Sequence, residues 1–204
     1  MTRSSRPLAD RERADLADLL DELGPGASTC CAGWDTAHLA AHLVVRDRRP
    51  DALPGFGLEQ LSAGLGAWSH RLEDRLRTST GYPEVVARVR SGPPAWLPMG
   101  WPGLRTVLNS TEYAIHHEDV RRAQPGWAPR PLPAGDQDEL WRSVAFFARR
   151  ATSAVPGSLV LRRADAPGVE KRAGRGEPTT VTGEPLELLL WTSGRKDVAR
   201  VEVG

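Results

Sequence analysis

Cysteine and lysine are scarce in this chain of 204 residues. The two cysteines, Cys30 and Cys31, are neighbours, and no CxxC pair occurs. A disulfide between adjacent residues is strained, so the sequence predicts neither a disulfide framework nor a cysteine-based metal site. Lysine occurs only at positions 171 and 196, so arginine carries nearly all of the basic charge.

An excess of charge of one sign and long apolar runs are also missing. The 27 basic and 26 acidic residues give a net charge of +1, which offers no electrostatic argument for binding nucleic acid or an anionic membrane. No stretch approaches the ~18 apolar residues of a membrane span, and the opening residues MTRSSRPLADRERADL contain no secretory signal. We therefore expect a cytoplasmic protein that binds neither nucleic acid nor membranes.

Several familiar catalytic motifs are absent as well. The sequence contains no glycine-rich phosphate loop, no HExxH and no GxSxG. These absences argue against the corresponding nucleotide-binding, metalloprotease and α/β-hydrolase sites, and any chemistry must come from another arrangement.

Apolar residues recur at helical spacing over most of the chain. The pattern predicts helices over residues 10–23, 36–49, 58–76, 83–90, 104–123 and 136–147. After Pro156 the character changes to short strand-like runs, SLVLRR, TTVTG and VARVEV, with one helical insert, EPLELLLWTSG. The sequence therefore predicts a helical bundle over residues 1–153 and a small α+β domain over residues 154–204.

Two adjacent histidines lie in the segment TEYAIHHEDVRRA, residues 111–123. On a helix, Glu112 and His116 are one turn apart and can meet at one point. Glu112, Asp119 and His116 lie on one shoulder of the apolar stripe, whereas His117 points to nearly the opposite side. His116 is therefore the candidate ligand, and we expect His117 to face solvent or another element.

A catalytic metal site commonly has three protein ligands and an open position, so a third ligand must come from elsewhere. The earlier segment DTAHLAAHLVVRD contains His38 and His42. His42 falls on the inward side, and His38 lies nearer the edge, at the surface or behind a ligand. His42, Glu112 and His116 would suit Zn²⁺ with a bound water, or Fe²⁺. A hydrogen-bonded core histidine and an ordinary helix-surface pair remain the alternatives.

Other side chains offer weaker signals. Arg46 lies on the same side of its helix as His42 and can reach into a cavity to bind an anionic group. His70 lies opposite the apolar stripe of its helix, and we assign it no role. Tryptophan-rich loops can cover a pocket or a partner, so both a monomer and a homodimer remain open.

Three segments carry a resemblance to a known family. GWDTAHLAAHL, NSTEYAIHHEDVRRA and GEPLELLLWTSGR resemble the actinobacterial relatives of mycothiol-dependent maleylpyruvate isomerase, within the wider DinB-like group of metal-binding proteins. The resemblance covers nearly the whole chain in order. It implies a mainly α fold, a DinB-like four-helix bundle followed by a small α+β C-terminal domain.

The resemblance also implies roles for individual residues. In the family a divalent metal, usually zinc, is bound at the positions that match His42, Glu112 and His116. An arginine of the C-terminal domain, here Arg195, would contact a substrate anion. Where the isomerase has an acidic residue, this chain has His38, so the surroundings of the metal differ.

The function that follows from the resemblance is thiol-dependent S-transfer or isomerisation of a small, electrophilic, carboxylated substrate. The metal, Zn with Fe or Ni as alternatives, would act with mycothiol, a low-molecular-weight thiol. Arg46 or Arg195 would hold the substrate carboxylate, and Asp119 would orient His116 or an adjacent water.

Two other functions remain open from the sequence. One is a non-catalytic protein whose metal is structural or sensory, with His38 completing a closed four-ligand site. The other is a metal-dependent hydrolase that uses water, with Asp119 or Glu118 as the base.

Overall fold

The computed structural model describes residues 6–52, 63–101, 108–152, 155 and 157–204. The chain divides into two compact units, Met1–Trp127 and Ala128–Gly204. No helix among the described residues is long and apolar enough to cross a membrane.

The boundary between the units lies earlier than residue 153, where the sequence pattern placed it. Helix α8 (Ala134–Ala151) packs against α9 (Pro185–Thr192) and against strand β2 (Glu170–Gly174). It therefore belongs to the second unit, although its amphipathic pattern resembles that of the helices that precede it.

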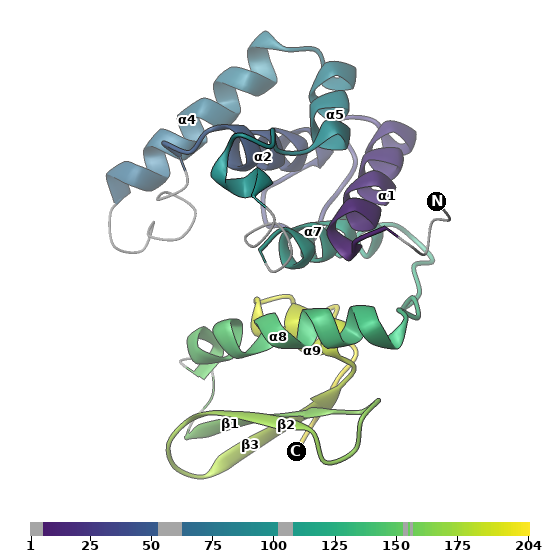
Figure 1. The fold of residues 1–204 in the computed structure, drawn as a ribbon, viewed down its shortest axis with the longest axis vertical. Coiled ribbons are helices and arrows are strands. Elements are labelled where there is room, and N and C mark those ends of the chain that lie inside the picture. Colours follow the sequence, from purple (N-terminus) through teal and green to yellow (C-terminus); the bar gives the residue numbers. More distant parts are fainter. Residues whose placement is uncertain (1–5, 53–62, 102–107, 153–154, 156) are drawn as a thin grey trace. The chain divides into compact units, whose positions relative to one another are not determined.

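The first unit is a bundle of helices (Figure 1). It contains α1 (Leu8–Leu23), α2 (Thr36–Arg48), α4 (Ala63–Ser79), the short α5 (Tyr82–Ser91), the 3₁₀ turn η2 (Pro98–Gly100) and α7 (Ser110–Arg121). Helix α1 packs along α7, and α2 packs along α4, while α5 contacts α1 and α2. The predicted helix residues 58–62 and 104–107 lie outside the described residues.

Local signals explain where α1 and α2 begin and end. The side chain of Asp35 accepts a hydrogen bond from the backbone N–H of His38 and so caps the first turn of α2. Helix α1 ends at Leu23, and Gly24 follows it with a φ of 77°, a conformation that glycine adopts without strain. The cap at Asp35 fixes where α2, the helix that contains His42, begins.

The second unit is a four-stranded sheet with two helices. The strands are β1 (Ser158–Arg163), β2, β3 (Pro178–Gly183) and β4 (Glu202–Val203), in the order β2-β1-β3-β4. Strands β1 and β3 are parallel, and the β1–β2 and β3–β4 pairs are antiparallel. Strand β2 was not predicted because its sequence, EKRAG, has no apolar residue suited to a core beyond Ala173.

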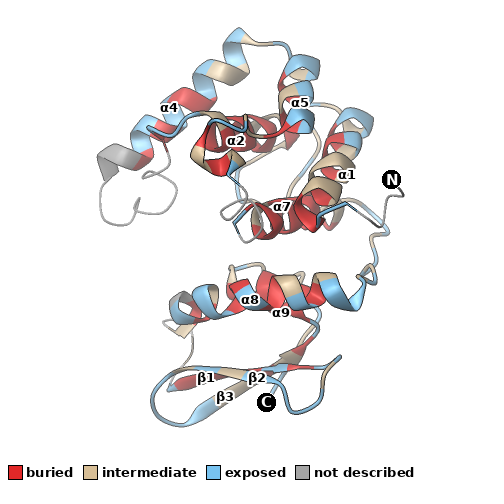
Figure 2. Ribbon diagram, viewed as in Figure 1, coloured by how far each residue is buried: buried red, intermediate tan, exposed pale blue. Residues whose placement is uncertain are grey.

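Helix α7 is buried along nearly its whole length, although its sequence is largely polar (Figure 2). Burying polar and charged groups is costly unless each finds a partner. The buried polar side chains of α7 include Thr111, His116, His117, Glu118 and Asp119. Their partners determine what this helix does.

Candidate metal centre

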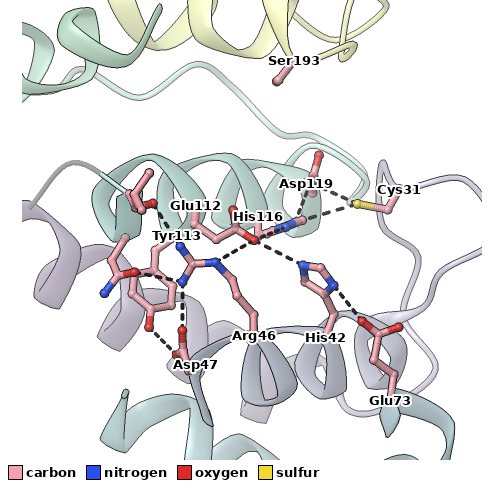
Figure 3. A network of polar contacts seen from close by, with 12 residues as sticks. Cys31, His42, Arg46, Asp47, Glu73, Glu112, Tyr113, His116, Asp119 and Ser193 are labelled. Carbon is pink, nitrogen blue, oxygen red and sulfur yellow. Dashed lines mark hydrogen bonds and ion pairs between the residues drawn. The ribbon is translucent and has the colours of Figure 1, made fainter. Parts of the chain in front are cut away.

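Three side chains from two helices converge on one point in the first unit (Figure 3). The Nε2 atom of His42, on α2, lies 3.2 Å from Oε1 of Glu112 on α7. The Nε2 atom of His116, one turn further along α7, lies 3.3 Å from the same oxygen. All three ligand atoms lie within 4.8 Å of one another. The structure thus brings together the three residues that the sequence selected.

These separations fit a tetrahedral metal. Zinc binds histidine nitrogen and carboxylate oxygen at about 2.0–2.2 Å, which places two ligand atoms of a regular tetrahedron about 3.4 Å apart. The two separations from Glu112 Oε1, 3.2 and 3.3 Å, are close to that value. Two imidazoles and one carboxylate are also a donor set that zinc, iron and nickel accept.

Each histidine is held at its other nitrogen by a separate carboxylate. Nδ1 of His42 lies 3.0 Å from Oε1 of Glu73, on α4. Nδ1 of His116 lies 2.9 Å from Oδ2 of Asp119. A carboxylate at Nδ1 keeps the proton there, orients the ring and directs the Nε2 lone pair toward the metal position.

The same contacts perturb the pKa values of the metal-free site. Burial by itself lowers the pKa of His42, but hydrogen bonds with Glu112 and Glu73 outweigh it, and the pKa is raised. For His116, burial is likewise outweighed by hydrogen bonds with Asp119, Cys31 and Glu112, which raise its pKa well above the ordinary value. Metal binding must therefore displace protons from both rings.

The carboxylate of Glu112 stays ionised despite its buried surroundings. Burial favours the neutral acid, but the charge of Arg46 and the hydrogen bonds of His116 and His42 hold the pKa well below its usual range. Nε of Arg46 lies 3.5 Å from Glu112 Oε1. The site therefore keeps an anionic oxygen ready for a cation.

Every nitrogen of the Arg46 guanidinium has a protein partner. Nη1 donates to Oδ1 of Asp47 and to Oδ1 of Asn109, each at 2.9 Å, and Nη2 donates to the carbonyl of Leu108 at 3.3 Å. Nε faces Glu112. This arrangement favours a positioning role for Arg46 over the predicted contact with a substrate anion.

The Asp47 side chain is bound in turn by a residue of α7, Tyr113. The Tyr113 hydroxyl donates to Oδ2 of Asp47 at 2.5 Å, and both side chains are buried. Burial and the neighbouring Asp47 charge raise the pKa of Tyr113 well above its ordinary value, so the phenol remains a donor. Asp47, Arg46 and Tyr113 thus form a buried chain of contacts that ends on the ligand Glu112.

A second group of side chains, Cys31, His116 and Asp119, shares His116 with the first group and lies at the Nδ1 side of its ring. Sγ of Cys31 lies 3.1 Å from Asp119 Oδ2 and 3.9 Å from His116 Nδ1. The backbone N–H of Cys30 donates to the Asp119 carbonyl at 2.9 Å, which fastens this loop to α7. Cys31 and Asp119 thereby support the ring from behind.

The remaining histidines have other partners. His117 is buried against α1, where its Nδ1 lies 2.8 Å from Oε2 of Glu12, so it faces another element rather than solvent. His38 contacts Asp35 at 2.7 Å. His70, given no role above, lies 3.1 Å from Oε2 of Glu73, the carboxylate that holds His42.

Two further predicted residues lie apart from this convergence. Glu118 is fully buried and forms ion pairs with Arg121 and Arg122 at 2.7 and 2.5 Å. Arg195 belongs to the second unit, where its Nη1 donates to the Ser193 carbonyl at 2.8 Å. Its contact with a substrate anion stays a prediction.

Sequence reasoning missed Glu73 and Cys31. The sequence did contain a signal for Glu73. This residue follows Leu72 and lies one turn after Ser69, so helical spacing places its carboxylate on the buried side of α4. Cys31 lies in the loop before α2, and no spacing rule links it to Asp119, 88 residues later.

The first unit is thus a helical bundle with a candidate divalent-metal centre between α2 and α7. Two solved structures share the fold of the whole chain. One is the crystal structure of the mycothiol-dependent maleylpyruvate isomerase, with 19% identity, a TM-score of 0.55, and 100% of this chain and 95% of that chain covered. The other is a histidine-to-alanine mutant of that isomerase, with 19% identity, a TM-score of 0.54, and 99% and 95% covered.

The shared fold confirms the predicted class, a mainly α DinB-like bundle followed by a small α+β domain. No family model and no curated protein matches the sequence. At this identity the likeness establishes the architecture alone.

Proposed function

We propose that the protein is a divalent-metal enzyme that uses a low-molecular-weight thiol, mycothiol, to transfer sulfur to, or isomerise, a small electrophilic substrate. One observation carries the metal part. Both Nε2 atoms meet Oε1 of Glu112 at the edge length of a zinc tetrahedron, while each Nδ1 is held by its own carboxylate. The shared fold of the mycothiol-dependent isomerase supports the thiol part.

The geometry argues against a purely structural role for His42. A structural imidazole satisfied by a backbone carbonyl would not need a metal, but His42 contacts the carboxylates of Glu73 and Glu112 instead. Two carboxylates on one buried ring fit a ligand whose Nε2 proton would be released to solvent when that nitrogen binds a cation.

The donor set also favours an open site over a closed one. Among the described residues, the group that converges with His42 consists of Glu112 and His116, and His38 is not part of it. Three protein ligands leave a coordination position for an exogenous group. When bound, Zn²⁺ lowers the pKa of a thiol or water in that position toward neutrality.

The protein's own residues then hold the site. Arg46 keeps Glu112 anionic, Glu73 and Asp119 orient the rings, and Trp34 packs against His42 with ring centroids 4.9 Å apart. Arg195 remains our proposed contact for a substrate carboxylate. Hydrolysis is less well supported, because Glu118 is engaged by two arginines and Asp119 is engaged by His116 and Cys31.

The first experiment is the metal content of protein purified without added metal. We expect about one Zn, Fe or Ni per chain in the wild type, and less than a tenth of that in His42→Ala, Glu112→Gln and His116→Ala. His38→Ala is the matched control, because it removes a histidine of the same helix and should keep the metal. A wild type that stays empty after reconstitution would contradict the proposal.

The thiol part needs a separate assay. Metal-loaded protein is mixed with mycothiol or glutathione and with maleylpyruvate or a general electrophile such as 1-chloro-2,4-dinitrobenzene. We expect turnover with mycothiol that disappears in Glu112→Gln. Full metal loading without turnover with either thiol would leave a metal-binding protein of structural or sensory function.

A further inference from the structure

A second pocket lies between α2, α4 and α5 and shares no residue with the metal centre. Its volume is about 260 Å³. The pocket is smaller than drug-sized sites of about 300–1,000 Å³. A ligand that fills it is therefore a small molecule.

The floor of the pocket is apolar and its rim is cationic. The ten lining residues are Val44, Val45, Arg48, Arg49, Leu72, Arg75, Leu76, Ser79, Thr80 and Arg88. Four of them are arginines and none is acidic, although the chain as a whole has 27 basic and 26 acidic residues. Like charges gathered around one hollow repel one another unless an anion lies between them.

Two of the arginines have carboxylate partners elsewhere. Arg49 pairs with Asp51 and Arg88 pairs with Glu84. Within the described part of the chain, Arg48 and Arg75 form no ion pair with a carboxylate. The net positive charge of the pocket therefore rests mainly on Arg48 and Arg75.

Hydrogen bonds to the end of α5 hold the Arg48 side chain in place. Its Nη2 donates to Ser91 Oγ at 2.6 Å and to the Gly92 carbonyl at 3.0 Å, at the end of α5. Its Nε is buried, as is Nε of Arg77 outside the pocket, so Arg48 presents its charge to the pocket through the rest of the guanidinium.

We infer that this pocket binds a small amphipathic anion, a carboxylate or phosphate group carried on a short aliphatic chain. The oxyanion would lie between Arg48 and Arg75, within reach of the Ser79 and Thr80 hydroxyls. The chain would lie against the apolar floor of Val44, Val45, Leu72 and Leu76. Arginine suits this role because its planar guanidinium matches both oxyanions.

The test is ligand-observed saturation-transfer NMR with three probes of one chain length: hexanoate, hexyl phosphate and hexanol. The protein is first stripped of metal with EDTA and then exchanged into EDTA-free buffer, so that the probes do not bind a metal ion. We expect hexanoate or hexyl phosphate to bind in the millimolar range and hexanol to bind about tenfold more weakly, because it lacks the charge-assisted hydrogen bonds.

Variants locate the binding. Arg48→Gln and Arg75→Gln should each weaken the anionic probe about tenfold. Arg71→Gln is the matched control, because Arg71 lies on the same helix as Arg75 but outside the pocket, over the Trp68 ring. Circular dichroism of each variant checks its folding, and Arg75→Gln removes no hydrogen bond of the described fold.

Three outcomes would overturn the inference. The first is no binding of either anion at 10 mM, roughly the weak end of specific affinity. The second is hexanol binding as tightly as the anions. The third is equal weakening in Arg71→Gln, which would show a general effect of surface charge.

Discussion

Nε of Arg46 and the ligand oxygen Oε1 of Glu112 lie 3.5 Å apart, and both histidines approach that same oxygen. In the metal-free protein the buried Arg46 guanidinium thus contacts two carboxylates, those of buried Asp47 and half-buried Glu112. A metal held by His42, Glu112 and His116 would add a second positive charge near this carboxylate. The negative charge of Glu112 would then offset part of the repulsion between the metal and Arg46.

Replacing Arg46 should weaken the site without removing a ligand. In Arg46→Met, Glu112 loses its charge partner and Asp47 loses a hydrogen-bond donor, so metal affinity should fall about 10–100-fold. Arg46→Lys should recover part of the lost metal affinity, because lysine restores the positive charge but not the several N–H donors of the guanidinium. Competition with a chromophoric chelator measures the affinity, and equal affinity in all three proteins would contradict the positioning role.

The carboxylates behind the rings should tune the site in the same way. Glu73→Gln and Asp119→Asn keep the shape but remove the charge that holds each Nδ1 proton. We expect one metal per chain in both variants at saturation, with affinity about 10–100-fold lower than in the wild type. Asp74→Asn, a neighbouring exposed carboxylate, should bind as the wild type does.

Replacing His116 and replacing His117 should have different effects, the first on metal binding and the second on stability. His116→Ala removes a ligand, so the metal should be lost while the fold persists. His117→Ala instead leaves Glu12 buried without its imidazole partner, so the protein should lose about 3 kcal/mol or more of stability and still bind one metal. Denaturant unfolding and metal analysis, run on both variants, separate the two effects. Metal loss in His117→Ala at low denaturant would contradict this division.

The stability of the metal-free protein should depend on pH through this site. The raised pKa values of His42 and His116 mean that their contribution is fully present below about 6.5 and is lost as pH rises through the folded values. Glu112, with a lowered pKa, contributes above about 4.5 and loses that contribution only as pH falls through its folded value. The cluster therefore stabilises the metal-free fold best between these two limits.

Metal binding reverses the trend, because both rings must be deprotonated to bind. The difference in melting temperature between metal-loaded and EDTA-treated protein should therefore grow from pH 5 to pH 8. Thermal melts at four pH values measure it. In Glu112→Gln the difference should be near zero at every pH, and a wild-type difference that shrinks with rising pH would contradict the assignment.

Helical spacing was enough to bring Glu112 and His116 together, because one turn of a helix places residues i and i+4 side by side, and it placed His42 on the inward side of its helix. Their metal binding stays a prediction. Helical spacing also placed Arg46 on the correct side of α2. It could not show that Asn109, 63 residues away, accepts a hydrogen bond from the Arg46 guanidinium. Contacts between distant segments depend on how the helices pack, and a single sequence does not encode that packing in any local pattern.

The domain boundary illustrates the same limit. Helix α8 has the amphipathic pattern of a bundle helix, and composition alone grouped it with the helices before it. Its apolar side packs against α9 and the sheet instead. Periodicity shows that a helix has a buried side, but the identity of the neighbour that covers it is a tertiary property.

The candidate ligands His42 and Glu112 are 70 residues apart in the chain. A cation held between them would act as a removable cross-link that closes a long loop and stabilises the folded state over the unfolded one. The lifetime of the protein would then depend on the supply of metal. Proteases should then digest the metal-free chain faster than the metal-loaded chain, and limited proteolysis with and without a chelator would measure the difference.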